Sequence, residues 1–280
     1  MLDRLVTLLD LEKIEENIYR GFSPEHSPVR VFGGQVAGQA LVAAGRTVPS
    51  ERGVHSLHAY FIRGGDPSVP ILYQVDRIRD GRSFTTRRVV AIQHGKAIFS
   101  LSASFQVAEE GIEHATEMPG VPDPESLPTL QERLGDFADQ LGVHARRRPI
   151  DLRYVNDPPW VTREDGGRAG RNQVWMRADG LLPDDELLHV CVLTYASDMT
   201  LLDSALARHG VYWEMDKVLG ASLDHALWFH RPFRADEWLL YDTESPTASG
   251  SRGLATGRFF SRDGRLIATV VQEGLLRVLR

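Results

Sequence analysis

The chain lacks several features that define whole classes of proteins. It has one cysteine, Cys191, so no internal disulfide can form and we expect a reducing, cytoplasmic location. No uncharged apolar run approaches the roughly 18 residues that a membrane-spanning helix needs, so we expect no insertion into a membrane. Basic residues are not in excess: the net charge is −6 at pH 7, which argues against a nucleic-acid partner. The composition is that of an ordinary globular protein.

Motifs for metals, nucleotides and serine nucleophiles are missing as well. His55 and His58 are three residues apart on a predicted strand and therefore point to opposite faces, which does not suit a metal site. The chain has no P-loop and no dinucleotide fingerprint. Ser222 lies in no Gly-x-Ser-x-Gly elbow, which disfavours a nucleophilic serine. We therefore expect no metal and no bound cofactor.

The chain does contain one pattern twice. Residues 58–103 and 225–272 each open with His-Ala on an aromatic strand, at His58 and His225. Each copy continues with a second strand, a Gly/Ser turn, a third strand, a tight glycine turn and a fourth strand. Two copies indicate a duplicated domain and not a solenoid.

A helix without a polar face is predicted ahead of the strands in each copy. Residues 33–48 are rich in Ala, Val and Leu, and residues 187–196 are almost uninterrupted apolar sequence. A helix that is apolar all round is buried, and a sheet that wraps around it covers most of its sides. The predicted fold is therefore α+β: a double hotdog whose halves join edge strands into one long sheet. Residues 2–19 are predicted to form an amphipathic helix.

A proline-rich stretch separates the copies. We expect a linker there with one short helix, near residues 128–141. The predicted organisation has an N-terminal repeat, the linker and a C-terminal repeat that carries the chemistry, over residues 1–108, 109–150 and 151–280.

Two polar residues interrupt apolar patterns in the second copy only. Asp198 lies near the end of the buried helix, where a carboxylate opposes the helix dipole. Gln272 shares a strand face with Ala268 and Val270, whereas its counterpart in the first copy is Ala103. A buried amide without partners costs ~1–3 kcal/mol. If the duplication began with two equal sites, the N-terminal one has lost its chemistry.

Two further features are weaker on their own. Ser222 stands just before a strand, where serine is most often a turn or cap residue. Gly33 and Gly34 open a buried helix and could offer backbone N–H groups to an anion or a carbonyl oxygen, although close packing explains them equally well. The register between the two helices is open: one alignment sets Asp198 against Gly33, and another sets it against Leu41.

Over nearly its whole length the chain resembles the acyl-CoA thioesterase II family, which includes bacterial enzymes and their peroxisomal relatives. Six segments carry the resemblance, in the order VFGGQV (31–36), HSLHAYF (55–61), RDGRSF (79–84), YASD (195–198), DHALWFHRP (224–232) and VQEG (271–274). The linker is the least similar part.

The resemblance implies hydrolysis of acyl-CoA to a free acid and CoA. The family's catalytic Asp, Ser/Thr and Gln fall on Asp198, Ser222 and Gln272; many relatives have Thr at the second position. This trio is thought to hold a water and not to form an acyl-enzyme, which suits a carboxylate base with an amide and a hydroxyl that orient the water. Gly33, Gly34 and His55 are candidates for oxyanion or substrate contacts. The family also commonly assembles, so a homodimer or higher homo-oligomer is expected.

Substrate contacts beyond the trio follow from the chemistry of acyl-CoA. The acyl chain needs an apolar tunnel, for which the surface between the two helices is the obvious source. The CoA phosphates need cations. Three arginine clusters are candidates without an assignment: Arg77, Arg79 and Arg82; Arg87 and Arg88; Arg146, Arg147 and Arg148.

Two other functions remain open on the sequence alone. A hydratase or dehydratase acting on acyl thioesters would pair a catalytic histidine with an acid, and His225 or His230 beside Asp198 could supply that pair. The other alternative is a protein that binds acyl-CoA without catalysis.

Overall fold

The computed structural model describes residues 2–24, 30–137, 148–162, 170–213 and 216–279. In the N-terminal half the strands are β1 (Glu12–Glu15), β2 (Ile18–Gly21), β3 (Arg52–Phe61), β4 (Ile71–Asp80), β5 (Phe84–Gln93) and β6 (Lys96–Val107). In the C-terminal half they are β7 (Ile150–Tyr154), β8 (Arg171–Ala178), β9 (Val218–Ser222), β10 (Asp224–Phe229), β11 (Leu239–Ser249), β12 (Arg252–Ser261) and β13 (Leu266–Val278). The helices are α1 (Leu2–Leu9), α2 (Gly33–Gly45), α3 (Leu130–Leu134), α5 (Pro159–Thr162), α6 (Glu186–Ser197) and α7 (Asp203–Ala207), with 3-10 turns η1 (Pro124–Ser126) and η2 (Gly135–Phe137).

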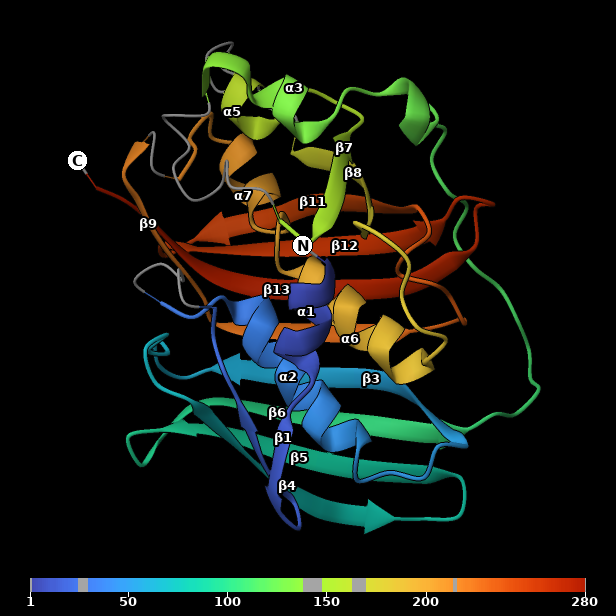
Figure 1. Cartoon of the computed structure of the whole chain (residues 1–280). Coiled ribbons are helices and arrows are strands. Elements are labelled where there is room, and N and C mark those ends of the chain that lie inside the picture. The colour runs from blue at the N-terminus through green and yellow to red at the C-terminus, as the bar shows by residue number, and fades with distance from the viewer. Residues whose placement is uncertain (1, 25–29, 138–147, 163–169, 214–215, 280) are drawn as a thin grey trace.

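All the strands belong to one 13-stranded sheet (Figure 1). Its order is β1-β2-β4-β5-β6-β3-β10-β13-β12-β11-β8-β7, with β9 beside β13. Read outward from the β3–β10 junction, the two halves have the same order, which makes the molecule a double hotdog. The predicted α+β fold and the single continuous sheet are thus confirmed.

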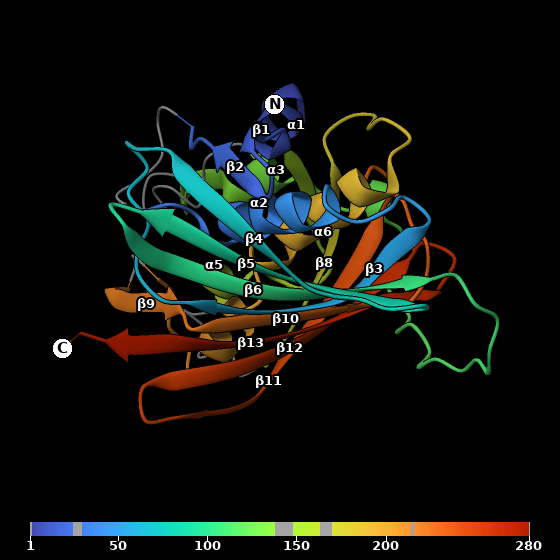
Figure 2. The same ribbon diagram turned by 90° about the horizontal axis from the view of Figure 1, so that it is seen from below.

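The two long helices lie together on one face of the sheet, as the view from below shows (Figure 2). They run antiparallel, and their backbones touch at two glycines. A Cβ on Gly34 would come 2.4 Å from the carbonyl oxygen of Tyr195, and one on Gly38 would come 3.2 Å from that of Cys191. Only residues without a side chain permit this spacing. As a result, the N-terminus of α2 meets the C-terminus of α6.

The N-terminal segment differs from the prediction of one helix over 2–19. Helix α1 ends at Leu9, and β1 and β2 form a hairpin that extends the sheet by pairing with β4. Asn17, at φ 62°, makes the turn. The apolar residues on both sides of this turn fit a helical period as well as an alternating one, so periodicity alone misassigns the segment.

The segment between the repeats holds little regular structure. Strand β6 ends at Val107 and β7 begins at Ile150, one residue inside the predicted linker. Of the predicted helix over 128–141, α3 and η2 occupy residues 130–137, and residues 138–141 lie outside the described part. A capping box between Thr129 and Glu132 starts α3. The repeat boundaries at 108 and 150 stay a prediction.

Helix α6 begins at Glu186, one residue before the apolar run of residues 187–196. Asp185 is its N-cap, and its carboxylate accepts hydrogen bonds from the N–H groups of Leu187 and Leu188. Seven of its residues are buried, as predicted for a helix with no polar face.

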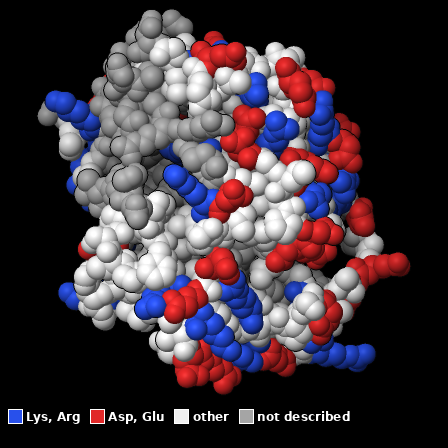
Figure 3. Space-filling model, viewed as in Figure 1, with Lys and Arg blue, Asp and Glu red and all other residues white. Residues whose placement is uncertain are grey.

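Acidic and basic side chains are interspersed on the face shown in Figure 3, with no large field of one sign. Within the described ranges, no helix is long and apolar enough to cross a bilayer.

Candidate functional site

The three residues that the family resemblance selects lie together. Asp198 is the C-cap of α6, Ser222 ends β9 and Gln272 lies on β13. The Gln272 amide nitrogen donates to Asp198 Oδ1 and to Ser222 Oγ, at 2.8 Å each. The Ser222 hydroxyl lies 3.4 Å from the same carboxylate oxygen. A carboxylate, a hydroxyl and an amide thus meet at one point between α6 and the sheet.

The first turn of α2 completes this cluster from the other repeat. The backbone N–H of Gly34 donates to Asp198 Oδ2 at 2.8 Å. A Cβ on Gly33 would lie 2.7 Å from the same oxygen and 2.9 Å from the Phe61 ring, so both glycines are required for close approach. The positive end of the α2 dipole offsets the unfavourable position of Asp198 at the end of its own helix. The Gly34 N–H is therefore engaged by the carboxylate, and a role in an oxyanion hole stays a prediction.

Burial sets the protonation of the carboxylate. It raises the pKa of Asp198 from 3.8 to about 6, against the opposing hydrogen bonds from Gln272, Gly34 and Ser222 and the charge of Arg148. A carboxylate with a pKa near neutrality is ionised at pH 7 yet basic enough to take a proton, which suits a general base.

His55 does not join this cluster. Its ring contacts the Ser104 hydroxyl at 2.8 Å and packs edge-on against Phe84. Strand β3 places Tyr60 opposite Asp224. His55 lies five residues away from Tyr60 along the same strand, which is about 16 Å. Burial lowers its pKa. This position gives no support to the predicted substrate contact of His55.

The two histidines considered for dehydration make other contacts. His225 Nε2 lies 2.8 Å from Ser197 Oγ, and His230 Nε2 lies 2.8 Å from Thr269 Oγ1. In the part of the chain that the structure describes, neither hydrogen-bonds to Asp198. Burial lowers the pKa of both, that of His225 to about 4, so His225 is neutral at physiological pH. Among the described residues, neither of these two histidines forms with Asp198 the pair that dehydration would require.

The register of the sheet corrects the alignment of the two repeats. Both halves have a strand irregularity at the same place: at His55 in β3, and at Leu223 between β9 and β10. Aligned on it, His225 corresponds to Leu57 and not to His58. The repeated His-Ala is thus one residue out of structural register, and a shift of one residue changes the face of a strand. His58 is accordingly exposed and His225 buried. In β10 the buried residues are His225 and Leu227, which alternate along the strand. The shared His-Ala dipeptide suggested the other face for His225.

The same alignment identifies what replaces the cluster in the first repeat. Ala103 pairs with Leu57 and corresponds to Gln272, as the sequence indicated. Ser222 corresponds to Val54. The C-cap of α2 is Arg46, so the helix ends set Asp198 against Arg46 and against neither Gly33 nor Leu41. The first repeat therefore has no acid, hydroxyl or amide at these positions.

A buried arginine fills the corresponding space in the first repeat. Arg87 corresponds to Ala255 and is 1% exposed. Its guanidinium donates to Thr47 Oγ1 at 2.9 Å and to Asp80 at 2.6 Å. Nearby, Arg52 bonds to the Gly81 carbonyl. These contacts tie the end of α2 to the β4–β5 hairpin, so Arg87 is structural and not a ligand for phosphate.

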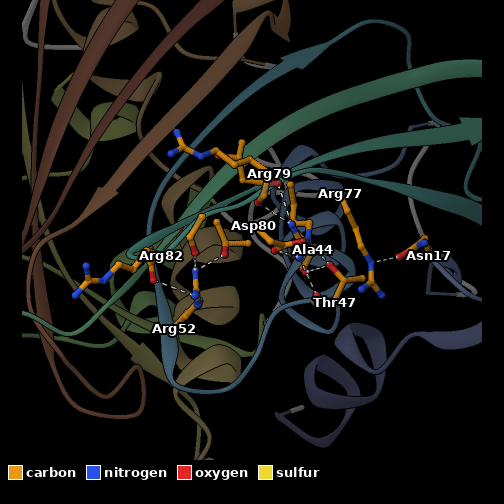
Figure 4. Close-up of polar contacts among 12 residues, drawn as sticks. Asn17, Ala44, Thr47, Arg52, Arg77, Arg79, Asp80 and Arg82 are labelled. Atoms are coloured by element: carbon orange, nitrogen blue, oxygen red, sulfur yellow. Dashed lines mark hydrogen bonds and ion pairs between the residues drawn. The ribbon is translucent and has the colours of Figure 1, made fainter.

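The other candidate arginines fall into three groups. Arg88 and Arg77 contact Asp76 and Asn17 through their side chains. Arg79 and Arg82 are exposed on the β4–β5 hairpin (Figure 4), at the far end of the 13-residue α2 and so about 20 Å from Asp198. Arg146 and Arg147 lie outside the described residues, whereas Arg148 is described.

Two small cavities flank the last turn of α6, and each has room for about one water molecule. One is apolar and lies between α6 and the sheet, and Met176, Val192 and Ala196 are among its lining residues. The other is lined by Arg148, Thr200 and others. The space between α2 and α6, expected to supply the tunnel, is instead closed by backbone contact at the glycines. Nowhere in the described ranges do three or more metal-ligating side chains gather.

Two family models match the chain. One, described as the acyl-CoA thioesterase N-terminal domain, covers residues 22–106, and one described as acyl-CoA thioesterase covers residues 143–275. The chain is 43% identical to acyl-coenzyme A thioesterase 8 of Mus musculus, over 98% of this chain and 89% of the relative. It is 41% identical to acyl-CoA thioesterase 2 of Haemophilus influenzae, over 99% and 98% of the two chains. The chain belongs to the acyl-CoA thioesterase family.

Solved structures agree with this assignment. Acyl-CoA thioesterase II TesB2 from Mycobacterium marinum superposes with a TM-score of 0.81 at 46% identity, over 98% of both chains. A hot dog fold protein of unknown function from Alicyclobacillus acidocaldarius has a TM-score of 0.79 at 19% identity, over 99% of both chains, and so shows the fold alone. The predictions of family and fold are confirmed.

Proposed function

We propose that the chain hydrolyses acyl-CoA thioesters to a carboxylic acid and CoA, using a water held by Asp198, Ser222 and Gln272. Family membership supports the reaction. The observation that carries the site is that a partly buried carboxylate receives hydrogen bonds from a side-chain amide and from a backbone N–H of the other repeat, at 2.8 Å each. The first repeat has only Arg46, Val54 and Ala103 at the matching positions, so each chain carries one such site.

In this mechanism Asp198 acts as the general base. It takes a proton from the water as the water oxygen bonds to the thioester carbonyl carbon. The tetrahedral intermediate then expels the sulfur, which receives the proton from Asp198 and leaves as the CoA thiol. Ser222 and Gln272 fix the carboxylate and orient the water. The entropic cost of positioning the water is therefore met before the chemical step and does not add to its barrier. No covalent acyl-enzyme forms.

The apolar residues beside α6 mark the path of the acyl chain. Val192 and Ala196, on the last two turns before Asp198, line the apolar cavity. Its present volume holds about one water molecule, so these side chains must move apart to admit an acyl chain. Arg148 lines the other cavity, and its charge lowers the pKa of Asp198. Arg148 therefore lies near the thioester end of the substrate and not at the phosphates, which the pantetheine arm of CoA holds apart from the thioester.

Release of free thiol from a long-chain acyl-CoA tests the site. Asp198→Ala and Gln272→Ala should each lower kcat by at least ~100-fold with the fold intact. Normal turnover in either variant would count against the site. A non-catalytic binder would instead show saturable binding and no thiol release, whether or not Asp198 is present. A hydratase would interconvert hydroxyacyl and enoyl thioesters without releasing CoA.

A cytoplasmic homo-oligomer is part of the proposal. Large apolar side chains on the N-terminal half of the sheet are exposed, among them Tyr60 at 66% and Ile78 at 57%, and an interface with a second copy would cover them. Light scattering coupled to size-exclusion chromatography measures the assembly, and a monomer at micromolar concentration would contradict it.

A further inference from the structure

A second polar side chain faces Gln272 inside the core. Strands β10 and β13 pair Ala226 with Val271, so the preceding residue, His225, stands directly opposite Gln272. Both side chains are buried, at 1% and 0% exposure. Directly opposed residues of an antiparallel pair have Cβ atoms about 5 Å apart and share a face. Their counterparts in the first repeat are two apolar residues, Leu57 and Ala103. The repeat that holds the carboxylate is thus polar at both positions of this pair.

Among the residues that the structure describes, each member of this pair has one buried polar atom without a hydrogen-bond partner. The two amide hydrogens of Gln272 go to Asp198 and Ser222. Its Oε1 atom is buried and needs a donor, and the buried Nδ1 of His225 is likewise left over once Nε2 contacts Ser197. Neither atom has a hydrogen-bond partner in the described part of the chain, so no hydrogen bond joins the two in this structure. The His225 ring is nevertheless close enough to Gln272 for their interaction to raise the pKa of the imidazole against the larger opposing effect of burial.

One proton arrangement leaves the fewest buried groups unpaired. A neutral imidazole has one N–H. The Ser197 hydroxyl also lies 2.9 Å from the Thr194 carbonyl oxygen, and it has one hydrogen to donate. With the proton on Nε2, Ser197 accepts from the ring and donates to Thr194, but the Nδ1 lone pair then faces the Gln272 oxygen and two acceptors meet. Rotating the amide by 180° would instead turn its oxygen toward the Asp198 carboxylate. With the proton on Nδ1, the ring donates to Gln272 Oε1 and accepts the Ser197 hydrogen at Nε2, and only the Thr194 carbonyl loses its contact with Ser197.

We propose that His225 is a positioning residue that holds the Gln272 amide through Nδ1–H···Oε1, so that both amide hydrogens stay on Asp198 and Ser222. Ser197 fixes the ring from its other side, from the position next to Asp198 in the chain. His225 contacts neither water nor substrate; it acts through Gln272. The inference rests on the proposed function of the Asp198 cluster.

Three substitutions separate the two ring nitrogens. In His225→Asn the amide nitrogen takes the place of Nδ1 and keeps the donor to Gln272. In His225→Gln the amide reaches the Nε2 position, and only the Ser197 contact survives. His225→Leu removes both contacts and introduces the residue that the first repeat has at this position, Leu57. We expect kcat to fall about 10- to 100-fold in the Leu and Gln variants, with KM within about twofold, and to stay within about threefold in the Asn variant.

Equal losses in the Asn and Gln variants would overturn the proposal, because a merely structural role does not distinguish the two nitrogens. Should the Leu variant fail to fold, the Asn–Gln comparison still decides. Nitrogen NMR of histidine-labelled wild type, with the His225 signal assigned by its loss in the Asn variant, should report the Nδ1–H tautomer; the Nε2–H tautomer would refute the network. If Asp198→Ala and Gln272→Ala lose activity while His225→Leu keeps it, only this inference fails. Full activity in Asp198→Ala would remove the proposed function itself.

Discussion

The backbone N–H of Gly34 donates to Asp198 Oδ2 at 2.8 Å across 164 positions of sequence. This contact joins the first turn of α2 in one repeat to the C-cap residue of α6 in the other. A carboxylate at the end of a helix faces the carbonyl groups of that helix, which is unfavourable. The N-terminus of α2 supplies the missing donor, so the packing of the two helices and the placement of the base are one structural arrangement.

Adding a methyl group at this contact should therefore separate the base from its support. In Gly34→Ala the new Cβ would meet the Tyr195 carbonyl oxygen at 2.4 Å, and backbone atoms must move apart. We expect kcat to fall at least about 10-fold and the free energy of unfolding to fall by roughly 1–3 kcal/mol. Gly53→Ala is the control, since its Cβ would meet nothing within 4 Å. Equal kcat and melting temperature in both variants would disprove the coupling.

The pH dependence of kcat should report the ionisation of Asp198. Burial raises the pKa of this carboxylate to about 6, and a general base works only when it is deprotonated. We expect kcat to rise with pH through a midpoint near 6 and to level off above about pH 7. Steady-state rates between pH 4.5 and 8.5 at saturating acyl-CoA measure this. A profile without change across that range would exclude Asp198 as the base.

Substitutions at Ser222 separate the contribution of its hydroxyl to catalysis from that of the side-chain shape. Its oxygen accepts from Gln272 at 2.8 Å, so Ser222→Ala leaves one amide hydrogen of Gln272 without an acceptor. We expect about a 10-fold or greater loss of kcat in Ser222→Ala. Ser222→Thr keeps the hydroxyl and should retain kcat within a few-fold. Thiol-release kinetics on both variants check this, and a larger loss in Thr than in Ala would contradict it.

The arginine that fills the first repeat should matter for stability and not for turnover. Arg87→Met abolishes buried hydrogen bonds to Thr47 while leaving Asp80, itself 56% exposed, in contact with water. We expect the free energy of unfolding to fall by roughly 1–3 kcal/mol and kcat per folded molecule to stay unchanged. Arg88→Met is the matched control, because the Arg88–Asp76 pair is largely exposed and such pairs contribute little. Denaturant titration of both variants separates the outcomes.

The fold was largely predictable because its signals are local. Alternating strands, glycine turns and two helices without a polar face point to the same architecture, and the family motifs select Asp198, Ser222 and Gln272. The N-terminal hairpin was missed because its apolar spacing also fits a helix, and only the conformation of Asn17, at φ 62°, separates the two.

The parts of the site that could not be predicted depend on contacts distant in sequence. No local pattern indicates that the Gly34 N–H reaches Asp198. The partnership of His225 with Gln272 was hidden by the shared His-Ala dipeptide. His225 lies two residues after the irregularity at Leu223, whereas His58 lies three residues after the matching irregularity at His55, so the two dipeptides are not equivalent. Irregularities of this kind are set by packing and leave no fixed sequence mark.

The two halves of the sheet belong to one chain, so the Asp198 cluster does not depend on the protein concentration. Where two identical subunits share a site, the site disappears as they separate at low concentration. Here each half meets the other at an effective concentration fixed by the segment that links β6 to β7, so the completed cluster survives however scarce the protein becomes. Fusion also frees the halves to diverge: one copy of the base suffices, and the other helix can specialise in holding it.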